Sequence, residues 1–103
     1  MLYLVSANLQ DRQLVAAPRE EFRELVQKVV LPSLELLFQF EADGKLLAGG
    51  VRAGTQDLVI ILDVKADSHM AVRHLLNQLP LFAFYHWEVT PLESFKDWTA
   101  LLK

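Results

Sequence analysis

The sequence predicts an α+β fold in which one antiparallel four-stranded sheet carries two helices on one face. Two observations lead to this prediction. Short β-favouring runs and segments with helical apolar spacing alternate in the order strand, helix, strand, strand, helix, strand. The chain has 103 residues, which is enough for one domain and too few for two independent cores.

The first strand and the first helix are separated by a polar stretch. Leu2 to Ala7 is a short apolar run with β-favouring residues at its centre, which predicts a strand. The segment 17–21, Ala-Pro-Arg-Glu-Glu, predicts a helix start, because proline is tolerated in a first turn and carboxylates stabilise a helix N-terminus. Pro32 lies inside this helix, so we expect a kink or a break near Leu31. The apolar spacing resumes in phase after the proline, which favours a kink. The predicted apolar face comprises Phe22, Leu25, Val26, Val29, Val30, Ser33, Leu36, Leu37 and Phe40.

The remaining elements follow a turn at Asp43-Gly44. Lys45 to Arg52 and Leu58 to Val64 are expected to form a hairpin, because a short Gly-containing loop joins two apolar runs. Asp67-Ser68 offers N-cap oxygens for a second helix that ends at Pro80. Phe84 to Thr90 is a fourth, aromatic-rich strand, and the apolar spacing after Pro91 predicts a short helix. This order of elements is a split βαβ, ferredoxin-like arrangement.

The apolar content exceeds what such a small domain needs for its own core. Hydrophobic residues make up 52% of the chain. The run Leu58 to Leu62 is apolar on both faces, although a sheet with one wet face should alternate apolar with polar residues. Leu31, Leu34 and Phe38 lie opposite the main apolar face of the first helix. We therefore expect a homodimer or larger homo-oligomer in which a second subunit covers the free sheet face.

Composition and motifs exclude several functional classes. The net charge is −3 and no basic stripe is present, so nucleic acid is not an expected partner. No apolar run is long enough to span a membrane, and zero cysteines are compatible with a cytoplasmic protein. His69 and His74 are five residues apart, which does not match the spacing of paired metal ligands, so no metal site is expected.

The C-terminal strand region resembles the closing signature of muconolactone delta-isomerases and their relatives. Its elements are the segments 77–82, Asn-Gln-Leu-Pro-Leu-Phe, and 87–92, Trp-Glu-Val-Thr-Pro-Leu. The opening segment 1–5, Gly44-Lys45, Gly54 and Asp63-Val64 are similar in order and spacing. The resemblance covers residues 1–92, and the tail 93–103 is expected to be a helical contact between subunits.

This resemblance implies a dimeric α+β barrel, often in larger rings of dimers, and cofactor-free chemistry. In that chemistry a base removes a proton beside the carbonyl of a small lactone acid, and an acid returns one elsewhere. The family resemblance implies a Glu-Lys pair on the first helix and a Trp-Arg pair on the second strand. The matching positions in this chain hold Ser33-Leu34 and Gly50-Val51.

Candidate chemical groups come from several strands. His86 and Glu88 share a face of the fourth strand and could act as proton carrier and orienting carboxylate, or only protect an edge strand. Arg52 suits a substrate carboxylate, because its guanidinium makes paired hydrogen bonds. The alternative is surface ion pairing, in which Arg52 pairs with Asp63 across the hairpin beside Lys65.

Other candidates would shape a binding site. Ser6 and Asn8 share a face of the first strand and could meet a ligand. The small residues 48–50, including Gly50, would either leave a cavity against Phe22, Phe38 or Phe40, or let the first helix pack closely. Two functions therefore remain open: a small isomerase, or a non-catalytic module that binds a small apolar or lactone ligand or serves in assembly.

Overall fold

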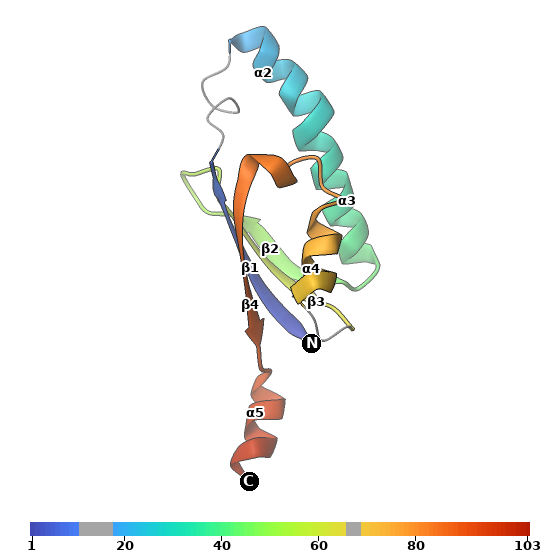
Figure 1. The fold of residues 1–103 in the computed structure, drawn as a ribbon, viewed down its shortest axis with the longest axis vertical. Helices are drawn as coiled ribbons and strands as arrows, with labels where there is room; N and C mark the ends of the chain where they lie inside the picture. Colours follow the sequence, from blue (N-terminus) through green and yellow to red (C-terminus); the bar gives the residue numbers. More distant parts are fainter. Residues whose placement is uncertain (11–17, 66–68) are drawn as a thin grey trace.

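The computed structural model describes residues 1–10, 18–65 and 69–103. Its strands and helices follow the predicted order (Figure 1). The strands are β1 (Leu2–Leu9), β2 (Leu46–Val51), β3 (Leu58–Asp63) and β4 (Tyr85–Leu92). The helical segments are α2 (Arg19–Leu25), η1 (Val26–Val30), α3 (Leu31–Ala42), α4 (His69–Leu76), η2 (Phe82–Phe84) and α5 (Phe95–Leu102).

The four strands form one antiparallel sheet in the order β2-β3-β1-β4. The central strand β1 pairs with β3 on one side and with β4 on the other, so β2 and β4 are the two edges. This topology confirms the predicted α+β class and the predicted edge position of the fourth strand. Every described pair of neighbouring strands is antiparallel. The hairpin joins the adjacent strands β2 and β3, and each connection through a helix leads to a strand that is not adjacent.

One sheet face carries the hydrophobic core. Alternate residues of β1 and β3 are buried there, and α3 and α4 pack on the same face through Phe40, Val72 and Leu76. The strand residues of this core are Tyr3, Val5, Ala7, Leu46, Leu58, Ile60, Leu62 and Trp87. The opposite side, called the open face below, presents Leu4, Ser6, Val59 and Ile61. No helix of the described residues packs on the open face.

Residues 19–42 form one continuous run of helix, so Pro32 does not break it. A π-helical turn, η1, precedes the proline. Proline lacks a backbone N–H and its ring crowds the carbonyl four residues back, and a widened turn accommodates both effects. The Ser33 hydroxyl donates a hydrogen bond to the Val29 carbonyl at 2.7 Å and so satisfies an acceptor in the irregular turn.

The first half of this helix extends past the sheet (Figure 1). Neither α2 nor η1 contributes a buried residue. Leu31 and Phe38, on the second apolar side that the sequence predicts, are 47% and 66% exposed. The predicted burial of this helix on two sides is therefore not achieved within one chain.

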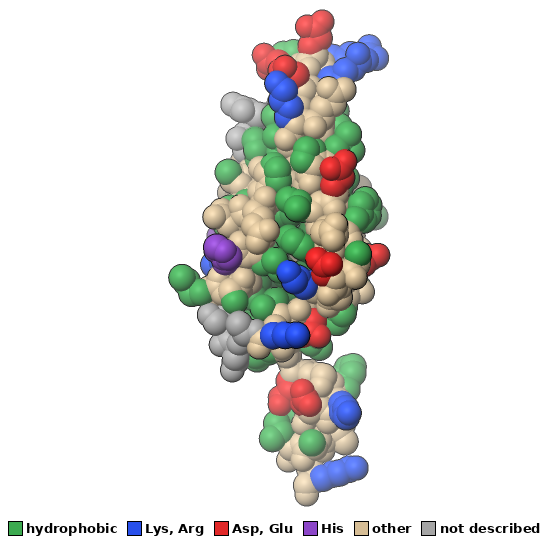
Figure 2. Space-filling model, turned by 90° about the vertical axis from the view of Figure 1, so that its right-hand side faces the viewer, with side chains coloured by type: hydrophobic (Ala, Val, Ile, Leu, Met, Phe, Trp, Pro, Cys, Tyr) green, Lys and Arg blue, Asp and Glu red, His purple; other side chains and the backbone are tan. Residues whose placement is uncertain are grey.

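The C-terminal helix α5 projects from the opposite end of the molecule (Figures 1 and 2). Ser94 caps it by accepting a hydrogen bond from the Asp97 backbone N–H at 3.1 Å. None of its residues is buried. The molecule is consequently elongated, with principal extents of 58 × 24 × 21 Å.

The other turns agree with the sequence. Gly44 ends α3 with a φ of +76°, a conformation that favours glycine, and Gly54 has a similar φ in the β2–β3 hairpin. The predicted N-cap Asp67-Ser68 lies outside the described residues. Across the described ranges, no helix is both long and apolar enough to cross a membrane.

Candidate functional site

A β-bulge in β2 decides which side chains of that strand reach the open face. Leu46 pairs with Leu62 and is buried on the helix side. The register then shifts, so that Ala48 pairs with Ile61. Without this extra residue, period-two alternation would direct Ala48, Gly50 and Arg52 toward the helices. The bulge reverses their direction and turns them to the open face.

Cross-strand pairing aligns several predicted residues in one row of the open face. Gly50 lies opposite Val59, Val59 opposite Ser6, and Ser6 opposite Glu88. In the next row, Asn8 lies opposite His86. The sheet therefore brings together on one face the candidate residues Ser6, Asn8, Gly50, Arg52, His86 and Glu88.

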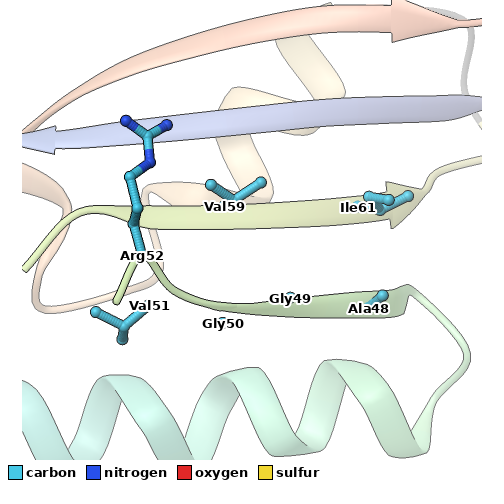
Figure 3. A pocket seen from close by; sticks show the side chains of 7 residues that line it. All are labelled: Ala48, Gly49, Gly50, Val51, Arg52, Val59 and Ile61. Atoms are coloured by element: carbon cyan, nitrogen blue, oxygen red, sulfur yellow. The ribbon is translucent and has the colours of Figure 1, made fainter. Parts of the chain in front are cut away.

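Arg52 extends across the open face from the β2 edge. In Figure 3 its side chain passes over β3 toward β1 and away from α3. It borders a shallow depression of about 340 Å³ that is otherwise lined by small and aliphatic residues of β2 and β3. The Arg52 backbone N–H donates to the Asp57 carbonyl at 2.8 Å, whereas its guanidinium has no ion-pair partner within residues 1–10, 18–65 and 69–103. The guanidinium is thus available for an anionic ligand.

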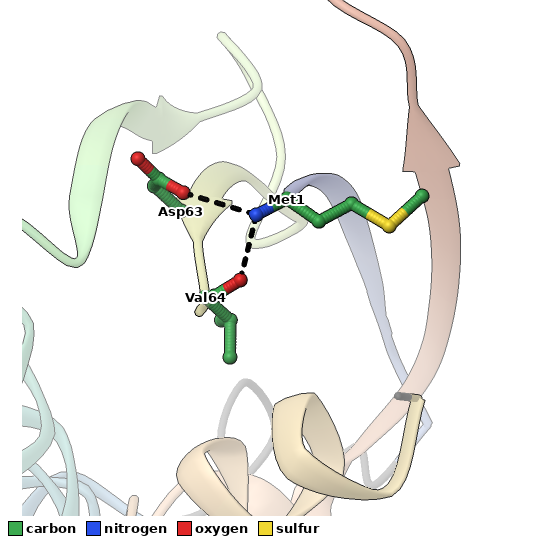
Figure 4. A network of polar contacts seen from close by, with 3 residues as sticks. All are labelled: Met1, Asp63 and Val64. Atoms are coloured by element: carbon green, nitrogen blue, oxygen red, sulfur yellow. Dashed lines mark hydrogen bonds and ion pairs between the residues drawn. The ribbon is translucent and has the colours of Figure 1, made fainter. Parts of the chain in front are cut away.

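The surface ion pair between Arg52 and Asp63 is not formed. Arg52 lies at the hairpin end of the sheet, whereas Asp63 lies at the far end of β3, opposite Leu2. Asp63 instead accepts a hydrogen bond from the Met1 amino group at 3.4 Å, and that amino group also donates to the Val64 carbonyl at 2.7 Å (Figure 4). The length of β3 separates the two charges that the sequence suggested would meet.

His86 and Glu88 lie side by side on the open face of the edge strand β4. The His86 Nε2 and the Glu88 Oε1 are 3.9 Å apart, and the two side chains are 60% and 67% exposed. Such an exposed pair contributes little to stability. The carboxylate therefore lies beside the imidazole, at a distance longer than a hydrogen bond.

The separation between Arg52 and the His86–Glu88 pair suits a small ligand. The sheet order places two strands between β2 and β4. Strands are about 4.8 Å apart, so the edges are about 14 Å apart. An extended arginine side chain spans roughly half of that distance. The remaining interval of about 7 Å is comparable to the width of a single five-membered ring with a carboxylate.

The candidate Phe38 lies apart from the open face, on the helix side of β2. It lines an apolar groove of about 140 Å³ between α3 and β2, together with Leu34, Leu37, Gly49 and Val51. Glu41 is the one ionisable side chain that lines this groove. A second apolar groove of about 140 Å³, called the end groove below, lies between α2–η1 and the hairpin end of the sheet. The end groove is lined by Phe22, Val26, Val30, Leu34, Leu81 and Tyr85, among others.

The predicted cavity against three phenylalanines is therefore divided. Phe22 lines the end groove and Phe38 lines the groove beside β2, but Phe40 is a core residue with 4% exposure. Gly49 serves close packing, because a Cβ there would lie 3.0 Å from the Val59 carbonyl oxygen. A Cβ on Gly50 would meet no atom within 4 Å, so that position leaves open space.

Ser33 and Leu34 have structural surroundings. Ser33 is fully buried, and its hydroxyl bridges two backbone segments by donating to Val29 and accepting from the Leu81 N–H at 3.0 Å. Leu34 lines both grooves. Neither residue offers a group that can take up a proton from a ligand near pH 7.

Tyr85 is a site residue that the sequence reasoning did not single out. Its hydroxyl donates a hydrogen bond to the Gln56 carbonyl at 2.7 Å, at the rim of the end groove. Burial raises the pKa of Tyr85 above its usual value of 10.0, and the nearby Asp57 carboxylate raises this pKa further. In the sequence, the signal that could have identified Tyr85 is its place in the aromatic-rich fourth strand. Only the fold shows that this strand lies beside the β2–β3 loop.

No cluster of three or more potential metal ligands occurs among the described side chains. On the open face, the Arg52 guanidinium and the His86–Glu88 pair lie on opposite sides of an apolar strip. The helix side offers apolar grooves with few ionisable groups.

Comparison with known proteins places this geometry in context. A family model described as muconolactone delta-isomerase matches residues 1–97, which extends into α5. A crystal structure of muconolactone isomerase is 25% identical, with a TM-score of 0.68 over 91% of this chain and 90% of that chain. A 5-chloro-2-hydroxyhydroquinone dehydrochlorinase from Burkholderia phenoliruptrix AC1100, in complex with 2,5-dihydroxybenzoquinone, is 18% identical. Its TM-score is 0.64 over 93% of this chain and 97% of that chain, which shows a shared fold. No protein of curated function matches the chain in sequence.

Proposed function

Because the chain belongs to the muconolactone delta-isomerase family, we propose that it catalyses a cofactor-free proton shift within a small lactone acid. The observation that carries this proposal is the shared placement of Arg52 and the His86–Glu88 pair on the open face. An anion anchor and an acid–base group are the two elements that such a reaction requires.

Each group has a specific role in the proposed reaction. The Arg52 guanidinium binds the substrate carboxylate through two parallel hydrogen bonds and fixes the ring on the sheet. Neutral His86 removes a proton from the carbon beside the carbonyl, and Glu88 orients the ring and stabilises the imidazolium. The same imidazolium returns the proton to another carbon as the double bond moves. The reaction is an isomerisation, so it needs no oxidant or reductant.

A homodimer would complete this site. Leu4, Val59 and Ile61 remain partly exposed on the open face of a single chain. We propose that the open face of a second copy covers them, as in a dimeric α+β barrel. Exclusion of water by the second sheet would strengthen the electrostatic contacts of Arg52 and Glu88 with the substrate and the imidazolium.

The proposal is tested with His86→Ala and the matched control His74→Ala. His74 is an exposed histidine on α4, away from the open face. Turnover of muconolactone is followed by absorbance, and proton exchange is followed by NMR in deuterated water. His86→Ala should lose about 10²–10⁴-fold in kcat with an unchanged melting temperature, whereas the control keeps full activity. Equal activity of the two variants, or no exchange by the unmodified protein, would contradict the proposed reaction.

A second candidate function is non-catalytic binding of a small apolar ligand in the groove beside β2. The observation that favours it is that Ser33 and Leu34 are uncharged, although the family resemblance implies a charged pair at these positions. In that case Phe38→Ala should weaken binding of a monocyclic aromatic probe, and His86→Ala should leave it unchanged. The opposite dependence would support the open-face reaction instead.

A further inference from the structure

The proposed proton shift places a second negative charge on its substrate. When the C–H bond beside the carbonyl breaks, its proton passes to His86 and its electron pair forms a carbon–carbon double bond, so the carbonyl oxygen becomes an enolate oxygen. A hydrogen-bond donor at this oxygen stabilises the transition state. We propose that the carboxamide of Asn8 is this donor. The inference rests on the proposed function and adds to it a catalytic residue on the central strand β1.

Asn8 lies in the same row of the sheet as the two groups that bind and deprotonate the substrate. It is directly opposite His86 in the β1–β4 pairing. Toward the other edge, the Leu9 N–H donates to the Asp57 carboxylate at 3.0 Å, and the Asp57 carbonyl accepts from the Arg52 N–H at 2.8 Å. Directly opposite side chains have Cβ atoms about 4.5–5.5 Å apart, so Asn8 and His86 can contact one small ligand.

The interval that Arg52 leaves for a ligand lies over β1 and β4. Two strand spacings of about 4.8 Å place β1 about 10 Å from the β2 edge. The Arg52 side chain leaves the β2 edge and passes over β3 toward β1 (Figure 3). A ring whose carboxylate contacts the guanidinium therefore covers β1, and its carbonyl oxygen comes within reach of a side chain on that strand.

The carboxamide of Asn8 is available to such a ligand. In β1 the residues Val5 and Ala7 are buried, whereas Asn8 is exposed on the open face. The Asn8 side chain makes no hydrogen bond within residues 1–10, 18–65 and 69–103. A carboxamide carries two N–H donors and has no proton to lose near pH 7. It can therefore donate to the enolate oxygen while His86 holds the transferred proton.

The other polar side chains of the open face suit this role less well. Glu88 only accepts hydrogen bonds, and neutral His86 needs a free nitrogen to take up the proton. Ser6 lies one row away, opposite Glu88, whose carboxylate competes for the hydroxyl proton. Thr90 lies one row further along β4. Asn8 is therefore the neutral donor closest to the base.

This contact also defines the class of substrate. In an unsaturated lactone the enolate is a dienolate, whose negative charge lies partly on the carbonyl oxygen. The imidazolium returns the proton to the far end of the dienolate, the oxygen electron pair re-forms the carbonyl, and the remaining double bond moves. All electrons stay within the substrate. The inference therefore requires an unsaturated lactone acid whose double bond and carbonyl become conjugated through the enolate.

Two variants of Asn8 separate hydrogen-bond donation from orientation of His86. Asn8→Ala removes the carboxamide, whereas Asn8→Asp keeps its size and its acceptor oxygen without the N–H donors. The matched control is Asn77→Ala, because Asn77 is an exposed asparagine that follows α4 on the core side of the sheet. Turnover of muconolactone gives kcat and KM. Calorimetric titration gives the affinity for tetronic acid, a five-membered lactone that is an enolate anion near neutral pH.

Both Asn8 variants should lose on the order of 10²-fold in kcat with KM almost unchanged, because the enolate oxygen forms only in the transition state. Both should bind tetronic acid about tenfold more weakly, and the control should match the unmodified protein. The melting temperatures should be equal, since Asn8 is exposed. Full activity of Asn8→Asp would overturn the proposal, because this variant can orient the imidazole but cannot donate to the substrate.

The affinity for tetronic acid separates this inference from the proposed function. Binding that depends on Asn8, without proton exchange by the unmodified protein, would overturn the reaction and keep the contact with the enolate oxygen. Proton exchange that requires His86 and is unaffected by Asn8→Ala would overturn the contact and keep the reaction. Loss of neither binding nor exchange in the Asn8 variants would likewise overturn the contact.

Discussion

The Ser33 hydroxyl accepts a hydrogen bond from the Leu81 backbone N–H at 3.0 Å, across 48 positions of sequence. The same hydroxyl donates to Val29, in the π-helical turn that precedes Pro32. One buried side chain therefore ties the irregular part of the long helix to the segment between α4 and β4. This contact also fixes the helix that forms one wall of each groove.

Replacement Ser33→Ala should lower the free energy of unfolding by about 1–3 kcal/mol, because the buried Leu81 N–H loses its acceptor. Denaturant unfolding measures this change. Ser94→Ala is a suitable control, since Ser94 caps the projecting α5, none of whose residues is buried. A similar small change in both variants would show that the buried hydroxyl does not carry the expected energy.

Arg52→Met should weaken binding of a lactone acid about 10–100-fold and leave the melting temperature unchanged. The expected loss is that of one charge-assisted contact, about 1.5–3 kcal/mol. Stability should not change, because the guanidinium has no ion-pair partner in the described part of the chain. Calorimetric titration measures the affinity, and Arg19→Met on the exposed start of α2 is the control. If a methyl ester of the same acid showed the same loss, carboxylate recognition by Arg52 would be wrong.

The adjacent glycines of β2 should respond differently to alanine. Gly49→Ala should destabilise the protein by about 1–3 kcal/mol, because its Cβ would press on the β3 backbone at 3.0 Å. Gly50→Ala should be neutral or stabilising by up to about 1 kcal/mol, since no atom lies within 4 Å and the unfolded chain loses freedom. Thermal unfolding of the two variants compares them directly. If both variants were destabilised equally, the placement of the bulge in β2 before Ala48 would be wrong.

Ionisation of Tyr85 should lower the free energy of unfolding at alkaline pH. Its pKa is higher in the folded protein than the ordinary value of 10.0, so above about pH 10 the unfolded chain loses its proton first. Stability from this group is fully present below pH 10 and is lost as the pH rises through the raised pKa.

The variant Tyr85→Phe isolates this effect. At neutral pH it should be less stable than the unmodified protein by about 1 kcal/mol, because the hydrogen bond to Gln56 is lost. Above pH 10 this difference should shrink or reverse, because phenylalanine has no proton to lose. Denaturant unfolding at both pH values measures the difference, and a constant difference would contradict the pKa argument.

Local signals in the sequence are enough to predict the element order, the α+β class and the edge position of β4. Helical spacing, turn glycines and strand runs are local signals, so they can be read without a partner strand. The surplus of apolar residues also indicated uncovered surfaces, which the structure locates on the open face, the outer side of the long helix and α5. The candidate residues Ser6, Glu88 and His86 could be chosen for the same reason, since alternation within a strand is local.

Which of these residues come together depends on how the strands pair in the folded chain. The segment 46–50, Leu-Leu-Ala-Gly-Gly, has no polar alternation, so nothing in it marks the bulge that turns Arg52 to the open face. The length of β3 likewise separates Arg52 from Asp63, although the sequence places both in the same predicted hairpin. Strand register depends on hydrogen bonds between distant segments, and a shift of one residue moves every following side chain to the other face of the sheet.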